Sequence, residues 1–520
     1  GRKIRYETAG TGKSLTLELG GKSPYIVFDD ADIDSAIEGL VDSIWFNQGQ
    51  VCCAGSRLLV HETIAKKFYK KLKFRMNRLR IGDPLDKSID MGAIVDPKQL
   101  NAITKLVNKN AHEGKVYQPN IKMPTKGCYY PPTLITEMEP SASLMQEEIF
   151  GPVLVSTTFR TPDEAIALAN NSKYGLAASI WTENINLALG IAPKLECGVV
   201  WINSVNQFDA AAGFGGKRES GFGREGGLEG LSGYVQPRIK TTILKKQKRY
   251  KRPISTSYSA DSLDKTLKLY IGGKQVRPDS GYSKPVFGPK GFITHVGDGN
   301  RKDIRNAVEA AHKAESWGKT SGHLKAQILY YLAENLDQRS AEFVESIVLS
   351  TGAKKEVAKK EVEASISRLF YYAAWADKFD GAVHDVPIRG VTLAMNEPLG
   401  VVGVICPEEN PLLGFISLAA PLIAMGNTSV LIPSASSPNI AANFYQILET
   451  SDVPAGVLNI ITGKEEAFVK TLSEHHDISA VWYFGAGNSS RDIERFSTAS
   501  LKRTWVNHNK NRDWYANGQG

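Results

Sequence analysis

The fold of this chain is decided early, at residues 15–28, where the sequence reads LTLELGGKSPYIVF. Two short apolar runs, residues 15–19 and 25–28, stand on either side of a Gly-Gly turn and predict buried strands. Residues 33–46 follow with apolar side chains at helical spacing, and acidic residues at their start suit the helix dipole. This alternation of strand and helix is typical of open parallel α/β sheets.

The same alternation returns in the second half of the 520-residue chain. The sequence predicts in turn a polar, Ser-rich linker, a strand, two long helices and three apolar strands, at residues 255–264, 267–271, 301–315, 324–336, 400–405, 429–432 and 457–461. A helix-like stretch follows each of the last three strands, as in nucleotide-binding sheets. Residues 1–18 also match residues 490–507 loosely, which indicates two related modules.

Composition is that of an ordinary globular protein, with 42% hydrophobic and 23% charged residues, so the chain can bury a core. The formal charge of +8 is spread thinly along it. The densest basic run, residues 245–252, has the composition of a nucleic-acid or anionic-membrane patch, but we interpret it as a solvated linker and expect no nucleic-acid partner. The longest apolar window, residues 412–425, is too short to cross a bilayer, so no membrane span is expected.

Five cysteines are present, an odd number without the paired spacing of a zinc site. They predict neither a disulfide framework nor a metal site, and they favour a reducing compartment, for which we expect the cytoplasm. The first residue is Gly1 rather than Met, and no cationic, apolar leader follows it. The sequence therefore reads as a piece of a longer polypeptide.

The most informative segment is residues 46–57, FNQGQVCCAGSR, in which two cysteines lie in a Gly-rich polar turn after the predicted helix. A thiol in such a turn can be exposed and have its pKa lowered by backbone dipoles, which makes it a nucleophile at neutral pH. The alternative is a pair of small buried residues. The residues by themselves leave both interpretations open.

Residues 46–57 resemble the active-site stretch of the NAD(P)-dependent aldehyde dehydrogenase superfamily, and residues 17–24 resemble its glutamate motif at the right distance upstream. The resemblance implies that Cys52 is the nucleophile and Glu18 the general base, with Cys53 in a structural role. A salt-bridged or surface position on a strand is the alternative for Glu18. Nearly all of residues 1–245 shares this resemblance.

Residues 147–153, EEIFGPV, resemble the family segment that contacts the nicotinamide end of the cofactor. The resemblance implies that Glu148 binds the ribose hydroxyls and that Phe150 packs near the nicotinamide. It also implies cofactor contacts from Leu19, Gly20 and Gln99. The expected cofactor is NAD, with NADP left open, and the expected substrate is a small-molecule aldehyde.

The chemistry of the residues agrees with these roles. A thiolate at Cys52 can add to an aldehyde carbon, and the oxyanion of the resulting thiohemiacetal needs hydrogen-bond donors such as the Cys52 N–H and an Asn side chain. After hydride transfer, a carboxylate with a raised pKa can deprotonate the water that hydrolyses the thioester. Without Glu18 the acyl-enzyme is expected to accumulate.

The second block resembles the N-terminal half of the same superfamily, but its functional positions differ. Residues 407–411 read PEENP, which puts Glu409 where the family has its oxyanion Asn unless a one-residue shift offers Asn410. Because a carboxylate repels an oxyanion, this copy is a poor active site.

The cofactor-binding positions of the second block differ as well. The family's cofactor-binding Lys falls at Ile432 and the following Glu at Ala435. The glycine-rich turn has Ser490 in place of its last glycine, and the general base falls at Asn507, which cannot take a proton at neutral pH. Dinucleotide binding by this block is therefore not expected.

A normal catalytic half joined to a decayed second copy resembles the family 16 two-domain aldehyde dehydrogenases. The implied fold class is α/β, with an open parallel-sheet catalytic domain, a Rossmann-like second-copy domain and oligomerisation strands. The expected parts are the end of a first cofactor-binding domain, a catalytic thiol domain, an oligomerisation strand with linker, and a degenerate second domain, at residues 1–20, 21–236, 237–264 and 265–520, respectively. The first copy's own cofactor-binding half would precede Gly1.

Two other interpretations remain open beside the enzyme. One is a catalytically weak scaffold or interaction protein, which the decayed second copy favours. The other is a permuted dehydrogenase, in which residues 265–510 fold back on residues 1–250. For assembly we expect a homodimer through a strand at residues 237–244 and a hairpin within residues 386–395, with intrachain pairing as the alternative.

Overall fold

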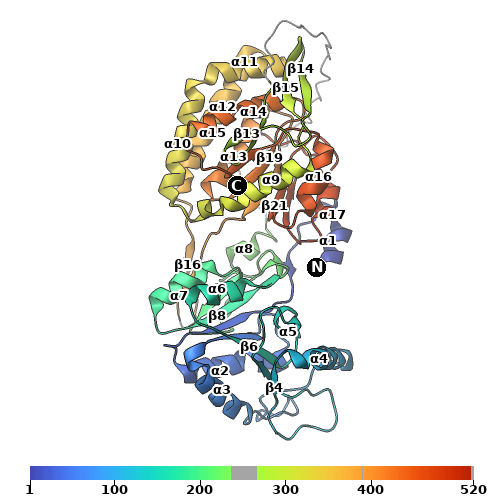
Figure 1. The fold of residues 1–520 in the computed structure, drawn as a ribbon, viewed down its shortest axis with the longest axis vertical. Helices are drawn as coiled ribbons and strands as arrows, with labels where there is room; N and C mark the ends of the chain where they lie inside the picture. The colour runs from blue at the N-terminus through green and yellow to red at the C-terminus, as the bar shows by residue number, and fades with distance from the viewer. Residues whose placement is uncertain (236–265, 389, 517–520) are drawn as a thin grey trace. The chain divides into compact units, whose positions relative to one another are not determined.

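A computed structural model describes residues 1–235, 266–388 and 390–516. The predicted strand at residues 237–244 and the predicted linker at residues 255–264 lie outside the described residues. Within the described part the chain forms two compact units, which Figure 1 draws as ribbons. The first contains mainly residues 14–235, and the second contains residues 2–13, 266–382 and 393–516.

The first unit is built on a seven-stranded sheet with the strand order β4-β5-β6-β3-β2-β8-β9. All neighbours are parallel except β4 and β5. In chain order the strands are β2 (Pro24–Val27), β3 (Arg57–His61), β4 (Lys115–Tyr117), β5 (Thr133–Thr136), β6 (Val153–Phe159), β8 (Ala177–Trp181) and β9 (Val199–Ile202). The helices are α2 (Ile33–Ile44), α3 (Glu62–Met76), α4 (Pro97–Asn110), α5 (Ser143–Gln146), α6 (Pro162–Asn170), α7 (Ile185–Ile191) and α8 (Gly227–Leu231).

Helices cover both faces of this sheet, because successive side chains of each strand point to opposite faces. Tyr25 and Val27 of β2 pack in one apolar cluster with residues of α2 and α3. Ile26, between them, packs in a second cluster with residues of α4, α6 and α7. The predicted helix at residues 33–46 is confirmed as α2, which the Asp32 carboxylate caps by accepting from the backbone N–H of Asp34.

Two short antiparallel pairs lie outside the main sheet of the first unit. β1 (Leu17–Glu18) pairs with β11 (Gly221–Phe222), and β7 (Tyr174–Gly175) pairs with β10 (Lys217–Arg218). The strand predicted over residues 15–19 is therefore shorter than expected. The β1 backbone pairs with a two-residue strand only, and residues 19–21 leave it to form other contacts.

The second unit has its own seven-stranded sheet, in the order β13-β12-β20-β19-β18-β21-β22. Its strands are β12 (Leu269–Ile271), β13 (Lys274–Val276), β18 (Val401–Ile405), β19 (Thr428–Ile432), β20 (Leu458–Ile460), β21 (Ala480–Tyr483) and β22 (Arg503–Val506). The neighbours β20 and β19, β19 and β18, β18 and β21, and β21 and β22 pair in parallel. β12 runs antiparallel to both of its neighbours, β13 and β20. A separate ribbon joins β14 (Ser283–Gly288) to β15 (Gly291–Gly297).

Helices also cover both faces of the second sheet (Figure 1). Val402 and Val404 of β18 pack with residues of α10 to α13, and Val401 and Ile405 pack with residues of α9, α16 and α17 on the other face. The helices are α1 (Arg2–Thr8), α9 (Arg301–Lys313), α10 (Gly322–Gln338), α11 (Ser340–Thr351), α12 (Lys355–Ala376), α13 (Pro411–Ala424), α14 (Pro438–Asn443), α15 (Tyr445–Glu449), α16 (Glu465–Glu474) and α17 (Ser490–Phe496). The predicted strands and long helices of this half are confirmed within a few residues at each end.

Helix α1, at the start of the chain, belongs to the second unit and packs beside α17. The Arg2 Nε donates to the carbonyl of Ala499 (3.1 Å), and the Arg5 guanidinium donates to the Thr504 hydroxyl (3.1 Å). The loose match between residues 1–18 and 490–507 agrees with the structure, since each segment contains a helix followed by a strand.

The hairpin expected within residues 386–395 is displaced along the chain. Its strands are β16 (Ala382–His384) and β17 (Thr392–Ala394), so the first strand ends before residue 386. Pro387 and Gly390 explain the difference, because both residues interrupt a strand and lie between the two pairing segments.

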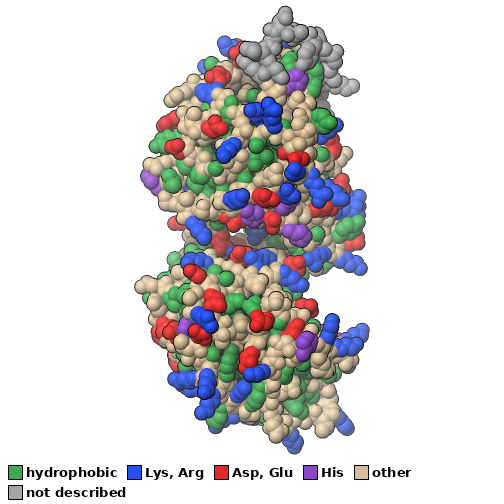
Figure 2. All heavy atoms as spheres, in the orientation of Figure 1, with side chains coloured by type: hydrophobic (Ala, Val, Ile, Leu, Met, Phe, Trp, Pro, Cys, Tyr) green, Lys and Arg blue, Asp and Glu red, His purple; other side chains and the backbone are tan. Residues whose placement is uncertain are grey.

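No helix among the described residues is long and apolar enough to cross a membrane. On the face shown in Figure 2, acidic and basic side chains are interspersed, as expected for a formal charge spread along the chain.

Candidate active site

A strained turn carries the cysteine pair. After α2 ends, Asn47, Gln48 and Gly49 have φ values of +47°, +47° and +73°, a left-handed conformation that non-glycine residues rarely adopt. The Asn47 side-chain amide donates to the carbonyl of Gln50 (3.0 Å), and the Gln50 side chain accepts from the backbone N–H of Val95 (2.9 Å). These bonds fix a conformation that the local sequence alone disfavours.

The turn leaves the two thiols in opposite environments. Cys52 is exposed, whereas Cys53 is buried in an apolar cluster with Leu176 and Trp201. A hydrogen bond from the Cys53 thiol, helped by backbone N–H groups and opposed by desolvation, lowers the pKa of Cys52 to about 7. The pKa of Cys53 is raised by the same hydrogen bond and by burial. About half of Cys52 is therefore thiolate at neutral pH.

Glu18 is held at the end of β1, where it pairs with Gly221. A Cβ atom on Gly215 would lie 2.7 Å from a Glu18 carboxylate oxygen and 3.0 Å from an Arg224 nitrogen, so the carboxylate and the guanidinium approach the same glycine. Burial raises the pKa of Glu18 to about 7, Arg224 lowers it, and the charge of Cys52 raises it. The Cys52 sulfur thus lies close enough to Glu18 for its charge to raise the pKa of that carboxylate.

Gly20 and Gly21 connect Glu18 to the other predicted site residues. The backbone N–H of Gly21 donates to the Glu148 carboxylate (3.0 Å), and a Cβ on Gly20 would lie 1.8 Å from the same carboxylate. A Cβ on Gly21 would lie 2.6 Å from the carbonyl oxygen of Cys52. Only glycine at both positions permits this approach, and it brings Glu148 and Cys52 to the same short segment.

The remaining predicted residues surround this segment. The backbone N–H of Leu19 donates to the carbonyl of Ser220 (3.1 Å). Phe150 has a φ of +53° and is 37% exposed, and the Gln99 side chain donates to its carbonyl (3.1 Å) and to that of Ile149 (3.2 Å). Gln99 therefore contacts the backbone of the loop that carries Phe150.

Sequence reasoning did not assign a role to Ser220 or Arg224. The buried Ser220 hydroxyl donates to the carbonyl of Gly20 (2.7 Å) and accepts from the N–H of Gly175 (3.0 Å). Arg224 donates to the carbonyls of Gly216 (3.1 Å) and Gly223 (2.7 Å) while it faces Glu18. The signal was available in the segment 214–225, where polar residues stand among four glycines.

Comparison with known proteins identifies the family of this chain. The sequence profile described as the aldehyde dehydrogenase family matches residues 1–240 and 282–509. The chain belongs to the aldehyde dehydrogenase family. It is similar to the mitochondrial benzaldehyde dehydrogenase of Antirrhinum majus, with 43% identity over 234 residues that cover 45% of this chain and 44% of the relative.

Retinal dehydrogenase 2 of Gallus gallus is similarly close, with 41% identity over 246 residues that cover 47% of each protein. Among solved aldehyde dehydrogenase structures, an NAD+ complex from Bacillus cereus is 39% identical, covers 45% of this chain and 48% of that one, and superposes with a TM-score of 0.44. The chain spans less than half the length of these curated relatives.

In the second unit, Asn410, which we expect near the position of the family's oxyanion Asn, is engaged in structural contacts. The Asn410 side-chain amide donates to the buried Glu361 carboxylate (3.5 Å) and to the Tyr515 hydroxyl (3.3 Å). Glu361 also accepts from the backbone N–H groups of Leu412 and Leu413 at the start of α13. The amide of Asn410 is thus already committed within the protein.

Ala435 and Asn507, which the resemblance aligns with two further functional positions of the family, also lie in structural contacts. The Glu408 carboxylate accepts from the backbone N–H groups of Ala435 (2.7 Å) and Ser436 (3.1 Å), so the turn after β19 already holds an anion. The side chain of Asn507 donates to the carbonyl of Gly485 (3.1 Å) and accepts from the Ser490 hydroxyl (3.3 Å). Asn507 therefore contacts the glycine-rich turn from both ends.

Proposed function

We propose that this chain carries the catalytic half of an NAD(P)-dependent aldehyde dehydrogenase, with Cys52 as nucleophile and Glu18 as general base. One observation carries the proposal: an exposed thiol with a pKa of about 7 interacts electrostatically with a carboxylate whose pKa is raised to about 7. Such matched values near neutral pH suit a nucleophile and a base that act in sequence.

The chemistry assigned to these residues follows from their environments. The Cys52 thiolate adds to the aldehyde carbon to form a thiohemiacetal, and the Cys52 backbone N–H is available to stabilise its oxyanion. When bound, NAD(P) accepts the hydride that converts the thiohemiacetal into a thioester. Glu18, unprotonated above pH 7, then removes a proton from the water that hydrolyses the thioester.

The residues around Gly20 and Gly21 fit the nicotinamide end of the cofactor. Glu148 is half-buried and has a raised pKa, chiefly because of burial, yet the Gly21 N–H fixes only one of its carboxylate oxygens. The other oxygen is available to a ribose hydroxyl. Phe150 has an exposed ring on the neighbouring loop, and the Gln99 side chain donates a hydrogen bond to the backbone of that loop. Leu19 and Gly20 form the adjoining wall of the proposed cofactor site.

We further propose that the chain comes from a two-domain enzyme of the family 16 type. In this proposal residues 21–236 form the catalytic domain and residues 265–520 a degenerate second copy. The engaged side chains of Asn410 and Asn507 support it. A cytoplasmic homodimer, paired through strands such as β16 and β17, completes the proposal. The same engaged positions favour a second candidate, a scaffold protein with weak catalysis.

The two candidates are separated by assays with and without cofactor. An activated ester such as p-nitrophenyl acetate acylates a thiolate without NAD, so it reports on Cys52 and Glu18 alone. NADH formation from NAD with benzaldehyde or retinal, the substrates named for the relatives, reports on the whole reaction. We expect ester hydrolysis, together with any NADH formation that the unmodified chain supports, to disappear in Cys52→Ser. If ester hydrolysis by the unmodified chain equals that of Cys52→Ser and no NADH forms, the scaffold is the better description.

A further inference from the structure

A small cavity lies in the first unit, directly after the Gly20-Gly21 segment. It holds about 250 Å³ of space outside the protein atoms, including its open mouth. Lys22, Ser23 and Arg57 line it, together with Tyr174, Glu196 and Cys197. Lys22 and Ser23 directly precede β2, and Arg57 is the first residue of β3. Tyr174 is the first residue of β7, and Glu196 and Cys197 lie just before β9. None of the roles proposed above uses this cavity.

Three of the residues that line the cavity carry a buried hydrogen-bond donor without a partner among the described residues. Lys22 is 2% exposed and Ser23 is 3% exposed, and within the described residues neither the Lys22 ammonium nor the Ser23 hydroxyl makes a hydrogen bond. The Nε–H of Arg57, also 2% exposed, is likewise unpartnered. An unpaired buried donor costs roughly 1–3 kcal/mol, and more when it is charged. Three such donors around one cavity indicate a missing acceptor.

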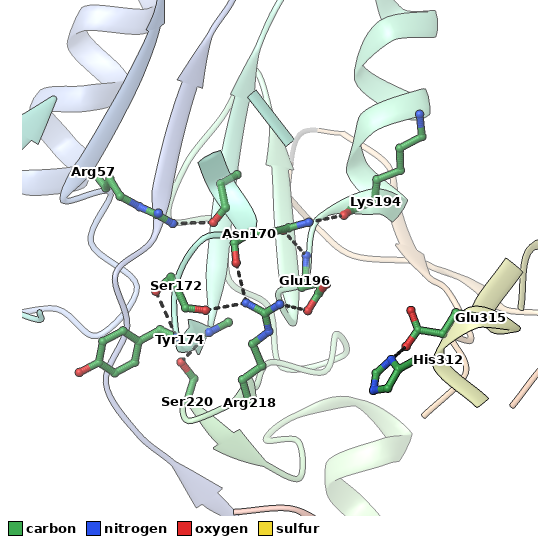
Figure 3. Close-up of polar contacts among 12 residues, drawn as sticks. Arg57, Asn170, Ser172, Tyr174, Lys194, Glu196, Arg218, Ser220, His312 and Glu315 are labelled. Atoms are coloured by element: carbon green, nitrogen blue, oxygen red, sulfur yellow. Dashed lines mark hydrogen bonds and ion pairs between the residues drawn. The ribbon is translucent and has the colours of Figure 1, made fainter. Parts of the chain in front are cut away.

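The charge of the cavity wall also indicates that an acceptor, and specifically an anion, is missing. The outer nitrogens of Arg57 donate to the carbonyls of Leu168 (2.9 Å), Asn171 (3.3 Å) and Ala169 (2.6 Å), which are neutral acceptors, and Figure 3 shows this guanidinium. Within the described part of the chain, no carboxylate forms an ion pair with Arg57 or Lys22. Buried charges are normally paired, so this wall carries an excess of positive charge.

Of the nearby carboxylates, two affect Lys22 without forming an ion pair with it, and the third is paired elsewhere. Burial and the charge of Arg57 lower the pKa of Lys22 to about 7. The charges of Glu148 and Glu147 raise this pKa, but by less. At the mouth, Glu196 forms an ion pair with Arg218, whose guanidinium also donates to the carbonyls of Asn170 and Ser172 (Figure 3).

We propose that this cavity is a binding site for a small inorganic anion of halide size, held by Lys22, Ser23 and Arg57. An anion accepts hydrogen bonds from all three donors, whereas a water molecule would also need acceptors for its own two protons. The interior is narrow, which favours a small ion over phosphate. A bound anion keeps Lys22 protonated and stabilises the segment that carries Glu18, Gly20 and Gly21.

The test compares thermal unfolding of the 520-residue chain in sodium chloride and sodium gluconate at equal ionic strength and neutral pH. Gluconate is too large for the cavity. We expect chloride at saturation to raise the Tm for unfolding of the first unit by about 3 °C. Lys22→Met, which keeps the length of the side chain without its charge, should remove this dependence. Lys71→Met, at an exposed lysine paired with Asp34 on the surface, is the control and should retain it.

A second measurement does not depend on a variant. Crystals of the unmodified chain soaked in bromide should show an anomalous difference peak in contact with the Lys22 ammonium. An equal chloride effect in Lys22→Met, or bromide peaks only at surface positions, would show that the cavity holds water and would overturn the proposal. Neither result would bear on aldehyde oxidation, since both readouts are independent of Cys52.

Discussion

Replacing Cys53 by alanine should make Cys52 a poorer nucleophile, although Cys52 itself is unchanged. The hydrogen bond from the Cys53 thiol is the largest of the effects that lower the pKa of Cys52 to about 7. Cys53 is 2% exposed in an apolar cluster that alanine fits, and the substitution also removes the hydrogen bond that its thiol donates to the Asn206 side-chain oxygen (3.6 Å). In Cys53→Ala the pKa of Cys52 should therefore rise from about 7 toward the ordinary thiol value of about 8.5.

The size of the effect follows from the thiolate fraction. With a pKa of about 7, about half of Cys52 is thiolate at pH 7. If the pKa rises to about 8, the thiolate fraction falls to roughly a tenth, and the alkylation rate at pH 7 falls about twofold. The loss is smaller than the change in thiolate because a thiolate of higher pKa is intrinsically more reactive.

The assay is the rate of iodoacetamide modification as a function of pH, with peptide mass spectrometry to assign the modified cysteine. The unmodified chain should show a midpoint near pH 7, and Cys53→Ala a midpoint about one unit higher. Cys53→Ser is the matched control, because its hydroxyl still donates to Cys52, and its midpoint should stay near 7. Identical midpoints in all three proteins, or a main adduct on another cysteine, would refute the reasoning.

Three further perturbations test other parts of the structure. Gly20→Ala should lower the free energy of unfolding by about 1–2 kcal/mol in urea, because the new Cβ displaces Glu148, whereas Gly190→Ala, with no atom within 4 Å, should not. Arg57→Lys should cost about 3 kcal/mol in the same measurement, since lysine cannot serve three backbone carbonyls at once. Lys502, buried in the second unit with a pKa lowered to about 7, is neutral in the folded state and protonated in the unfolded state between pH 7 and roughly 10. Stability should therefore rise with pH across that window, and Lys502→Met should reduce the rise by about 2 kcal/mol between pH 7 and 9.

Much of the architecture is predictable from local patterns in the sequence. α2 follows from apolar spacing and an acidic start, and β18, β19 and β20 follow from uninterrupted apolar runs, as expected for strands buried on both faces. The hairpin was misplaced because alternation alone does not locate a turn, whereas Pro387 and Gly390 do.

The candidate site was only partly predictable. Cys52 and Glu18 carry motif information, but the left-handed turn at Asn47 and Gln48 depends on tertiary contacts that no local pattern encodes. Ser220 lies about 200 positions from the glycine whose carbonyl it binds, so only the fold reveals its role. The unpaired donor of Lys22 is similarly invisible in sequence, because burial without a partner is a property of packing.

The most direct test of the central claim is the lifetime of the acyl group on Cys52. The unmodified chain and Glu18→Gln are mixed with p-nitrophenyl acetate, quenched at intervals, and the acetylated Cys52 peptide is quantified by mass spectrometry. If Glu18 activates the hydrolytic water, the acetyl group should persist at least about 100-fold longer in Glu18→Gln. Equal lifetimes in the two proteins, or no acetyl group on Cys52 in either, would contradict the assignment.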